Sequence, residues 1–130
     1  MLVLDASIAV TASSAPEGFD EFASERLVAP ALMWSEARSA LHELACRGML
    51  APDIAAGAWA RLERGPIEER RHRSLGKRAW ELADRFGWAK TYDAEYVALA
   101  DLLGCRLLTL DLRLRRATDR LGFVVVPAEL

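Results

Sequence analysis

Two acidic residues in this chain each follow a short apolar run. Asp5 comes directly after Leu2-Val3-Leu4, and Asp111 closes the run 106–110. Both runs have the composition of strands that are buried on both faces of a parallel sheet. Ligand sites in open α/β sheets form at the carboxyl ends of strands, and an acid buried there is costly unless it is paired or binds a cation. We therefore expect Asp5 and Asp111 to meet at a functional edge of the sheet.

Two further acids lie near predicted helix starts. Glu36 is in the first turn of a helix over 33–47, on the side away from its apolar stripe, and Asp93 is in the first turn of an apolar helix over 92–103. Acids in a first turn can simply compensate the helix dipole, which is worth about 0.3–1 kcal/mol. That explanation is adequate for Glu36 taken alone. It is weaker for Asp93, because so apolar a helix predicts surroundings that are not open solvent.

The four carboxylates together indicate a metal site. Crowded carboxylates repel one another and would be partly protonated without a cation. Hard oxygen ligands suit Mg²⁺ or Mn²⁺, which could polarise a phosphodiester, lower the pKa of a bound water and stabilise the leaving oxygen. Ser7 and Thr109 each stand two residues from an acid, and the Thr109 hydroxyl could orient an acid in the same pocket. The spacing leaves open whether one or two metals bind.

Basic residues follow the last of these acids closely. They are Arg113, Arg115, Arg116 and Arg120. Arginines at this spacing either form a solvated helix face or, for Arg113 or Arg116, reach phosphates beside the acids. The formal net charge of −2 argues against nucleic-acid binding by bulk charge, so a local patch of this kind would be needed. The two histidines, His42 and His72, are far from the acids along the chain, which disfavours a histidine-based nuclease mechanism.

The positions of these residues require strands that alternate with helices. The predicted strands are 2–4, 27–29, 67–73 at a sheet edge, 106–110 and 122–126. The predicted helices are 8–12 with Ser7 as its cap, 17–24, 33–47, 52–62, 74–86, 92–103 and 112–119. Such alternation is typical of α/β proteins with a parallel sheet and helices on both faces. A length of 130 residues without a long linker favours one domain.

Composition narrows the class of protein. Hydrophobic residues make up 52% of the chain and charged residues 28%, which allows a core and excludes a disordered chain. Cys46 and Cys105 match neither a disulfide framework nor a zinc spacing, so both are expected to be small buried residues. No apolar run approaches the roughly 20 residues that span a bilayer, and the first residues show no signal-peptide pattern. We expect a soluble cytoplasmic protein without membrane contact.

Four segments of the chain resemble the PIN-domain family. They are Leu4-Asp5-Ala6-Ser7, Pro30 to Glu36 at the start of a helix, Tyr92-Asp93-Ala94-Glu95-Tyr96-Val97-Ala98-Leu99-Ala100, and Leu108-Thr109-Leu110-Asp111. The most specific is the stretch from Tyr92 to Asp111, with an acid, a buried helix, Gly104 and a strand that ends in Thr-x-Asp. Length and element order match along essentially the whole chain. More narrowly, the sequence resembles VapC-type toxins of bacterial toxin–antitoxin pairs.

The resemblance implies a three-layer α/β/α sandwich with a central five-stranded parallel sheet, formed by residues 1–130 as a single PIN-like domain. It implies a toxin that hydrolyses RNA as an endoribonuclease and depends on Mg²⁺, or on Mn²⁺ in its place. The family's four acids fall on Asp5, Glu36, Asp93 and Asp111, and its small hydroxyl positions fall on Ser7 and Thr109. Some PIN nucleases carry a further acid where this chain has Arg113, which counts against a strong second metal site. Implied partners are RNA, a VapB-like antitoxin and a second copy of the chain.

Two other functions compete with this interpretation. An aspartate-nucleophile phosphatase of doubly wound fold would also place an acid after the first strand. That chemistry favours a second acid two residues after the nucleophile, where this chain has Ser7. A degenerate PIN-like module could instead bind a partner without cleaving RNA, although the presence of all four acids argues against it.

Overall fold

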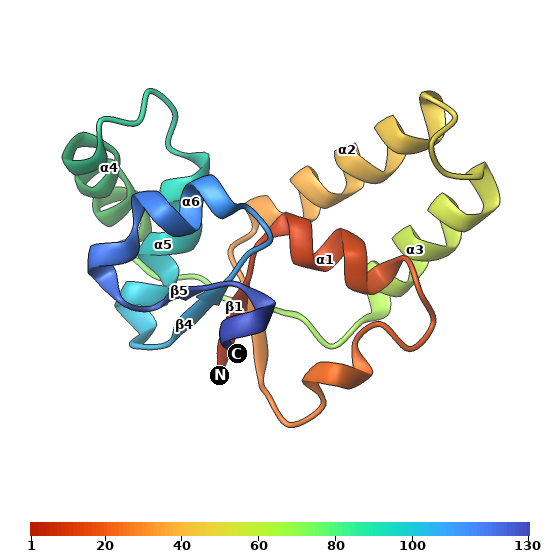
Figure 1. Ribbon diagram of the computed structural model, residues 1–130, viewed down its shortest axis with the longest axis horizontal. Coiled ribbons are helices and arrows are strands. Elements are labelled where there is room, and N and C mark those ends of the chain that lie inside the picture. The colour runs from red at the N-terminus through yellow and green to blue at the C-terminus, as the bar shows by residue number, and fades with distance from the viewer.

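The centre of the fold is a parallel five-stranded sheet with the strand order β3-β2-β1-β4-β5 (Figure 1). The computed structural model describes residues 1–130. Its strands are β1 (Leu2–Leu4), β2 (Leu27–Ala29), β3 (Glu68–Glu69), β4 (Arg106–Leu108) and β5 (Val124–Val125). Val3 of β1 is in register with Val28 on one side and Leu107 on the other. The strand before Asp5 is therefore the middle strand of the sheet.

Helices cover both faces of this sheet. They are α1 (Ala6–Ser13), α2 (Leu32–Cys46), α3 (Pro52–Arg64), α4 (Leu75–Phe86), α5 (Tyr92–Leu103) and α6 (Leu112–Ala117). In Figure 1, α1, α2 and α3 lie to one side of the sheet, and α4, α5 and α6 lie to the other. Three short 3₁₀ helices complete the chain: η1 (Asp20–Phe22), η2 (Asp119–Leu121) and η3 (Pro127–Glu129). The predicted three-layer α/β/α sandwich with a five-stranded parallel sheet is confirmed.

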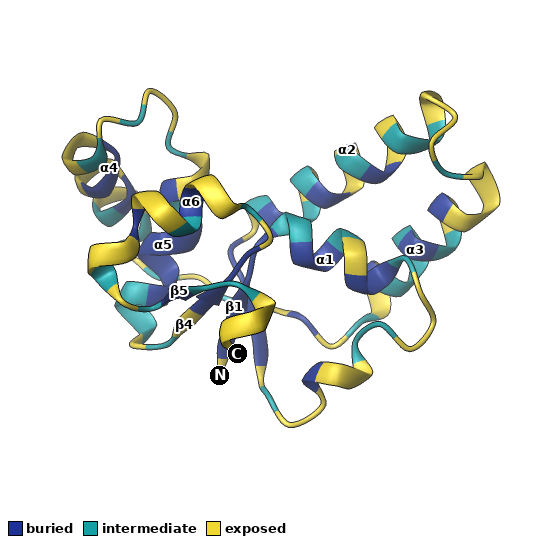
Figure 2. Ribbon diagram, viewed as in Figure 1, coloured by how far each residue is buried: buried dark blue, intermediate teal, exposed yellow.

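The core is formed by the central strands and the helix faces against them, which are the dark blue parts of Figure 2. All three residues of β1 are fully buried, as expected for a strand with helices on both faces. Helix α5 packs on β1 and β4 and is buried from Tyr96 through Ala100. Gly104, with a φ of 63°, ends α5 in the left-handed conformation that glycine adopts without strain.

Some sequence predictions were wrong in local detail. The predicted helix 17–24 is only the 3₁₀ helix η1, because Gly18 passes so close to the end of α1 that a Cβ there would lie 1.8 Å from the Ala12 carbonyl oxygen. The sequence pattern predicts a buried stripe of Ile54, Ala58, Trp59 and Leu62 on α3. The buried residues are instead Ala55, Ala58 and Leu62, and Ile54 is 45% exposed. Small alanines allow α3 to approach α1 and α2 closely.

The sheet edges and cysteines show further differences. The charged run around Glu68 is an edge strand as predicted, although β3 is only two residues long, and β5 is also shorter than predicted. Cys46 is exposed at the end of α2, and Cys105 is half-buried, so the prediction that both are buried was wrong. No helix has the length and apolar composition needed to cross a membrane.

Candidate active site at the carboxyl edge of the sheet

Asp5 lies where β1 gives way to α1, and it caps that helix. Its side chain accepts the backbone N–H of Ile8 at 3.2 Å and the hydroxyl of Ser7 on Oδ1. Its other oxygen, Oδ2, accepts the hydroxyl of Thr109. The predicted cap Ser7 is therefore inside the helix, and the cap is the carboxylate itself. A carboxylate that caps a helix is stabilised by the helix dipole, which helps this acid to remain only 8% exposed.

Thr109 and Ser7 join the ends of β1 and β4. The fully buried Thr109 hydroxyl donates to Asp5 and accepts the backbone N–H of Asp111 at 3.0 Å. The Ser7 hydroxyl oxygen accepts the N–H of Leu110 at 3.1 Å. Asp111 in turn caps α6, with Oδ1 accepting the N–H of Arg113 at 2.8 Å. The two acids after the central strands are thus held by one connected hydrogen-bond network.

Glu36 is held by a buried tyrosine. The Tyr96 hydroxyl donates to Glu36 Oε1 at 2.6 Å, and Tyr96 is only 2% exposed. Helix α2 begins at Leu32, one residue earlier than predicted, so Glu36 is its fifth residue and lies just beyond the first turn. Dipole compensation is therefore no longer an adequate explanation for this acid, because that effect falls off within the first turn.

Sequence reasoning missed Tyr96, although a signal was present. Tyr96 stands three residues after Asp93 on α5, a spacing that puts both residues on one side of a helix. In an otherwise apolar helix, a tyrosine is most simply interpreted as a core residue. Its hydroxyl, however, needs a hydrogen-bond partner when it is buried, and only a polar side chain at this edge could supply one.

Asp93 completes the group, from the first turn of α5. Burial raises its pKa, the charges of Asp111 and Asp5 raise it further, and Arg113 partly opposes them. Burial is also the main cause of the raised pKa of Glu36; the Tyr96 hydrogen bond lowers it, and the charges of Asp93 and Asp5 add to the rise. The charges of Asp5, Asp93 and Asp111 thus act on neighbouring acids, which places all four acids within one region of negative potential.

The pKa of Asp5 shows how this region differs from ordinary surface. Burial raises that pKa more than the hydrogen bonds from Ser7 and Thr109 lower it. The only basic side chain that counteracts the charge on Asp93 is that of Arg113, which is 93% exposed and whose Nε lies 3.8 Å from Asp111 Oδ1. The four acids are therefore poorly neutralised, a state that a cation relieves.

The donor set fits a hard divalent cation, because it consists of carboxylate and hydroxyl oxygens without nitrogen or sulfur. The four carboxylates do not form a coordination shell in this structure. No three His, Cys, Asp or Glu side chains lie close enough together to hold a metal ion. Both oxygens of Asp5 instead face hydroxyl and amide groups. The predicted residues share one edge, but their carboxylates are spread around it.

Neither histidine belongs to this region. His72 Nδ1 accepts the backbone N–H of Ser74 at 3.0 Å, which orders the turn before α4. His42 is exposed on α2 and lines a hollow between α2 and α3 together with Trp59. The interpretation that these histidines take no part in the acid site agrees with both positions.

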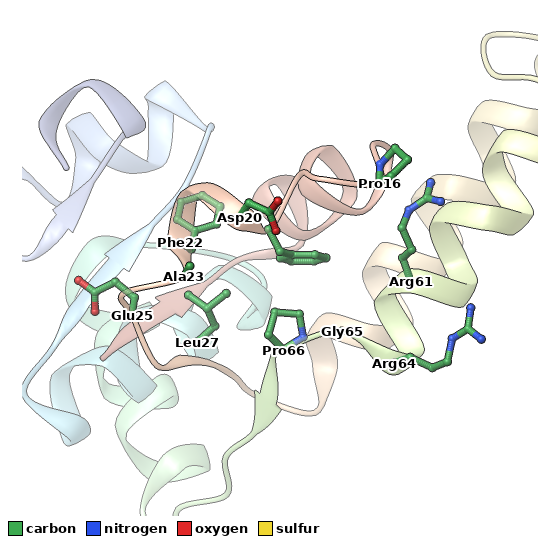
Figure 3. Close-up of a pocket in the computed structure, with 11 residues that line it drawn as sticks. Pro16, Asp20, Phe22, Ala23, Glu25, Leu27, Arg61, Arg64, Gly65 and Pro66 are labelled. Carbon is green, nitrogen blue, oxygen red and sulfur yellow. The ribbon is translucent and has the colours of Figure 1, made fainter.

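A cavity of about 420 Å³ lies away from the acids (Figure 3). In Figure 3, Arg61 and Arg64 of α3 stand on the opposite side of it from Phe22 and Leu27. Leu27 begins β2, so this cavity is next to the amino end of a strand. None of the four acids lines it. The Nε of Arg61 donates to the Ser13 carbonyl at 2.7 Å, which ties α3 to α1.

The sequence model of the PIN domain matches residues 2–120 of the chain. The chain belongs to the PIN-domain family. Among curated PIN-domain relatives, it is 41% identical to the VapC ribonuclease Mb0985 of Mycobacterium bovis over 120 residues, which cover 88% of each chain. Ribonuclease VapC9 of Mycobacterium tuberculosis matches to the same extent. Likeness to these proteins places the chain with the VapC members of the PIN-domain family.

Two proteins of Pyrobaculum aerophilum extend the comparison. Ribonuclease VapC3 is 34% identical over an alignment of 144 positions, which covers 97% of this chain and 98% of that protein. The crystal structure of PAE2754 superposes with a TM-score of 0.78, covers 98% of this chain and 90% of its own, and is 22% identical. At that identity the structural likeness shows the PIN fold alone.

Proposed function

We propose that this protein is a Mg²⁺-dependent endoribonuclease in which Asp5, Glu36, Asp93 and Asp111 hold the metal, with Mn²⁺ able to replace Mg²⁺. One observation carries the proposal: four acids from separate elements share one sheet edge with little cationic compensation. There the charges of Asp111 and Asp5 raise the pKa of Asp93, and the charges of Asp93 and Asp5 raise that of Glu36. That arrangement occurs in a chain of the PIN-domain family whose curated relatives are named ribonucleases. PIN-domain ribonucleases are in general metal-dependent.

The chain's own residues would prepare this edge for a bound RNA phosphate. When bound, Mg²⁺ would polarise the scissile phosphodiester and lower the pKa of a bound water. Ser7 and Thr109 hold the Asp5 carboxylate in one orientation, as outer partners of metal ligands do. Tyr96 holds Glu36 from the core side. Arg113 and Arg116, which follow Asp111 on α6, would bind phosphates next to the one that is cut.

We also propose that the protein is the toxin of a VapBC-type pair. Support comes from the names of its relatives, since VapC proteins are paired with VapB antitoxins. A VapB-like antitoxin, RNA and a second copy of the chain are then the expected partners. Because both RNA and such an antitoxin are intracellular, we expect the protein to act in the cytoplasm.

Replacing Asp5 by asparagine tests the proposed site. Asparagine caps a helix about as well as aspartate, so Asp5→Asn should fold while it removes one negative charge. We expect cleavage of total RNA in Mg²⁺ to be lost and the heat of Mn²⁺ binding by calorimetry to fall. Glu25→Gln, at the far edge of the sheet, is the matched control and should retain both. Full cleavage by purified Asp5→Asn would contradict the proposal.

A degenerate partner-binding module is the second candidate function. The spread of the carboxylates, which form no three-membered cluster, is the observation that favours it. Such a module would bind no Mn²⁺ in an Asp5-dependent manner and would leave RNA intact. An aspartate-nucleophile phosphatase gains no support, because Ser7 donates to Asp5 where that chemistry needs a second acid. Trapping of a phosphorylated Asp5 would reverse this judgement.

A further inference from the structure

A groove of about 500 Å³ lies between the end of α4 and the segment formed by α6 and η2. Six residues line it: Arg85, Phe86, Arg116, Ala117, Asp119 and Arg120. Three of the six are arginines, and they come from two parts of the chain that are about thirty positions apart. None of the four proposed metal ligands lines the groove.

The groove carries uncompensated positive charge. None of its three arginines forms an ion pair with a carboxylate, whereas Arg26, Arg78 and Arg115 each do. Its one acid, Asp119, is already neutralised by Arg115, whose Nη1 lies 2.7 Å from Asp119 Oδ1. In a chain with a formal net charge of −2, such a concentration of unpaired guanidinium groups marks a site for an anion.

Two neighbouring arginines of α6, Arg115 and Arg116, differ in whether they have a carboxylate partner. Arg115 is held by Glu129 at 2.7 Å as well as by Asp119, so it acts as a structural tie to the end of the chain. Arg116, the next residue, is exposed on the groove with no carboxylate partner. The Arg116 guanidinium group is therefore free for a ligand in the groove, whereas that of Arg115 is engaged within the protein.

The Phe86 ring holds the guanidinium group of Arg85 in place. The Arg85 Cζ atom lies 5.5 Å from the centroid of the Phe86 ring, a cation–π arrangement. The Phe86 ring is itself stacked on Trp88, with centroids 4.9 Å apart and an angle of 19° between the planes. Trp88 therefore has a partner within the protein, and Arg85 has its N–H groups available for phosphate oxygens.

Helix α6 leads from the acid site to the groove. Asp111 caps the start of this helix, Arg113 is in its first turn, and Arg116 is five residues beyond Asp111. At the helical rise of 1.5 Å per residue, Arg116 lies roughly 7.5 Å further along the axis. Arg120 on η2 then extends the row of positive charge away from the acids.

We propose that this groove binds the phosphate backbone of single-stranded RNA, on one side of the phosphate held at the acids. The inference rests on the proposed ribonuclease function, which supplies the strand. Guanidinium groups pair with phosphate oxygens whatever the base, so the groove adds affinity and register without reading the sequence. Phosphate contacts made this way depend on salt, because each one releases counterions.

Binding of a labelled RNA tests the groove apart from cleavage. In an Asp5→Asn background, the affinity of a fluorescein-labelled 16-nucleotide single-stranded RNA is measured by anisotropy over a range of salt concentrations. The double variant Arg85→Gln/Arg120→Gln should lose two phosphate contacts. The magnitude of the slope of log K against log [salt] should then fall by about 1.4. Binding at physiological salt should weaken by about tenfold. Arg85→Lys/Arg120→Lys retains the charges and should restore the slope.

The matched control removes the same charge elsewhere. Arg64 and Arg73 are exposed, make no ion pair and lie outside the groove, so Arg64→Gln/Arg73→Gln should bind RNA as the parent does. Circular dichroism melts establish that each variant is folded. If the parent binds RNA and Arg85→Gln/Arg120→Gln binds it with the same affinity and salt slope, the groove is not an RNA site. That result would overturn the groove proposal without contradicting the ribonuclease proposal.

Two further outcomes separate the alternatives. If the wild-type protein neither binds nor cleaves RNA, the proposed function fails and this inference fails with it. Labelled poly-glutamate reports on an acidic protein segment as the occupant. Loss of poly-glutamate binding in Arg85→Gln/Arg120→Gln, together with unchanged RNA binding, would assign the groove to such a segment and overturn the proposal.

Discussion

Both edges of the sheet carry acidic residues, but the acids are neutralised by ion pairs at one edge and hardly at the other. At the amino edge, Glu25 lies 2.9 Å from the terminal amine of Met1 and 3.7 Å from Arg106. Next to it, Arg26 forms a bidentate ion pair with Glu68, in which Nη2 lies 2.8 Å from Oε2. At the carboxyl edge, Asp5, Glu36 and Asp111 are held by hydroxyl and amide groups, and the one ion pair to the four acids is the 3.8 Å contact between Arg113 and Asp111.

This contrast shows that the chain is able to neutralise acids and does not do so where β1 and β4 end. Ordinary surface acids are paired or solvated at little cost, whereas Asp5 is buried and its pKa is raised by that burial. Proteins tolerate such destabilising arrangements mostly at functional sites, where activity is gained in exchange for stability. The four predictions below test the contrast, beginning with the largest expected effect.

Thr109→Val should weaken Mn²⁺ binding and RNA cleavage by about 10–100-fold, the range for loss of an outer partner of a metal ligand. The change leaves one oxygen of Asp5 and the N–H of Asp111 without their partner. Thr118→Val is the control, because Thr118 is equally buried and its hydroxyl donates only to backbone carbonyls of its own helix, those of Leu114 and Arg115. Calorimetry with Mn²⁺ measures the difference. Equal loss of Mn²⁺ affinity in both variants would show a general packing defect.

Tyr96→Phe should lower Mn²⁺ affinity by about tenfold, at the lower end of the same range, because Glu36 loses its only hydrogen bond from the core. Tyr92→Phe on the same helix is the control, since Tyr92 is 53% exposed. Calorimetry and cleavage of total RNA are compared for both variants. Unaltered Mn²⁺ affinity in Tyr96→Phe would remove Tyr96 from the site.

Asp93→Asn should raise the thermal stability of the metal-free protein at pH 7 by a few degrees. The pKa of Asp93 is raised by burial and by Asp111 and Asp5, so the folded state holds the proton more tightly than the unfolded state. Wild-type stability from this group therefore falls as pH rises through the raised pKa. The gain in the variant should vanish below about pH 3.9, where both states are protonated.

Scanning calorimetry across pH checks this sign, and saturating Mg²⁺ should reverse the order by stabilising the wild type more. A variant that is less stable at pH 7 without metal would show that the charge of Asp93 is already compensated.

Glu25→Gln should have the smallest effect. This half-exposed carboxylate pairs with the terminal amine of Met1 and with Arg106, and surface pairs of this kind contribute about 0–1 kcal/mol. Urea unfolding should show a loss within that range, while RNA cleavage and Mn²⁺ binding stay unchanged. A large loss of cleavage would mean that the two edges are not independent.

The sequence was most informative where one physical effect dominates. Leu2-Val3-Leu4 is apolar throughout because both faces of β1 are covered, and α5 is apolar around most of its circumference for the same reason. Acids that directly follow such runs stand out, so Asp5 and Asp111 could be placed at one edge. The fold class follows from the alternation of these elements.

Features that depend on close contacts between distant segments could not be read from the sequence. The 3₁₀ helix η1 replaces a predicted helix because the backbone at Gly18 lies against α1, a tertiary contact. The buried face of α3 is set by how closely its alanines approach α1 and α2, so Ala55 is buried in place of Ile54. Tyr96 resembled a core residue, and Arg85 reaches the α6 groove only through the packing of α4.

Two of the acids are also helix caps, and this gives the protein its own spectroscopic reporters. The N–H of Ile8 donates to the Asp5 carboxylate, and the N–H groups of Arg113 and Leu114 donate to that of Asp111. Any ion that draws electron density from these carboxylates changes the amide hydrogen bonds. In nitrogen-15 spectra, shifts of these three amide resonances on titration with Mg²⁺ would therefore reveal occupancy of the site without RNA, cleavage or mutation.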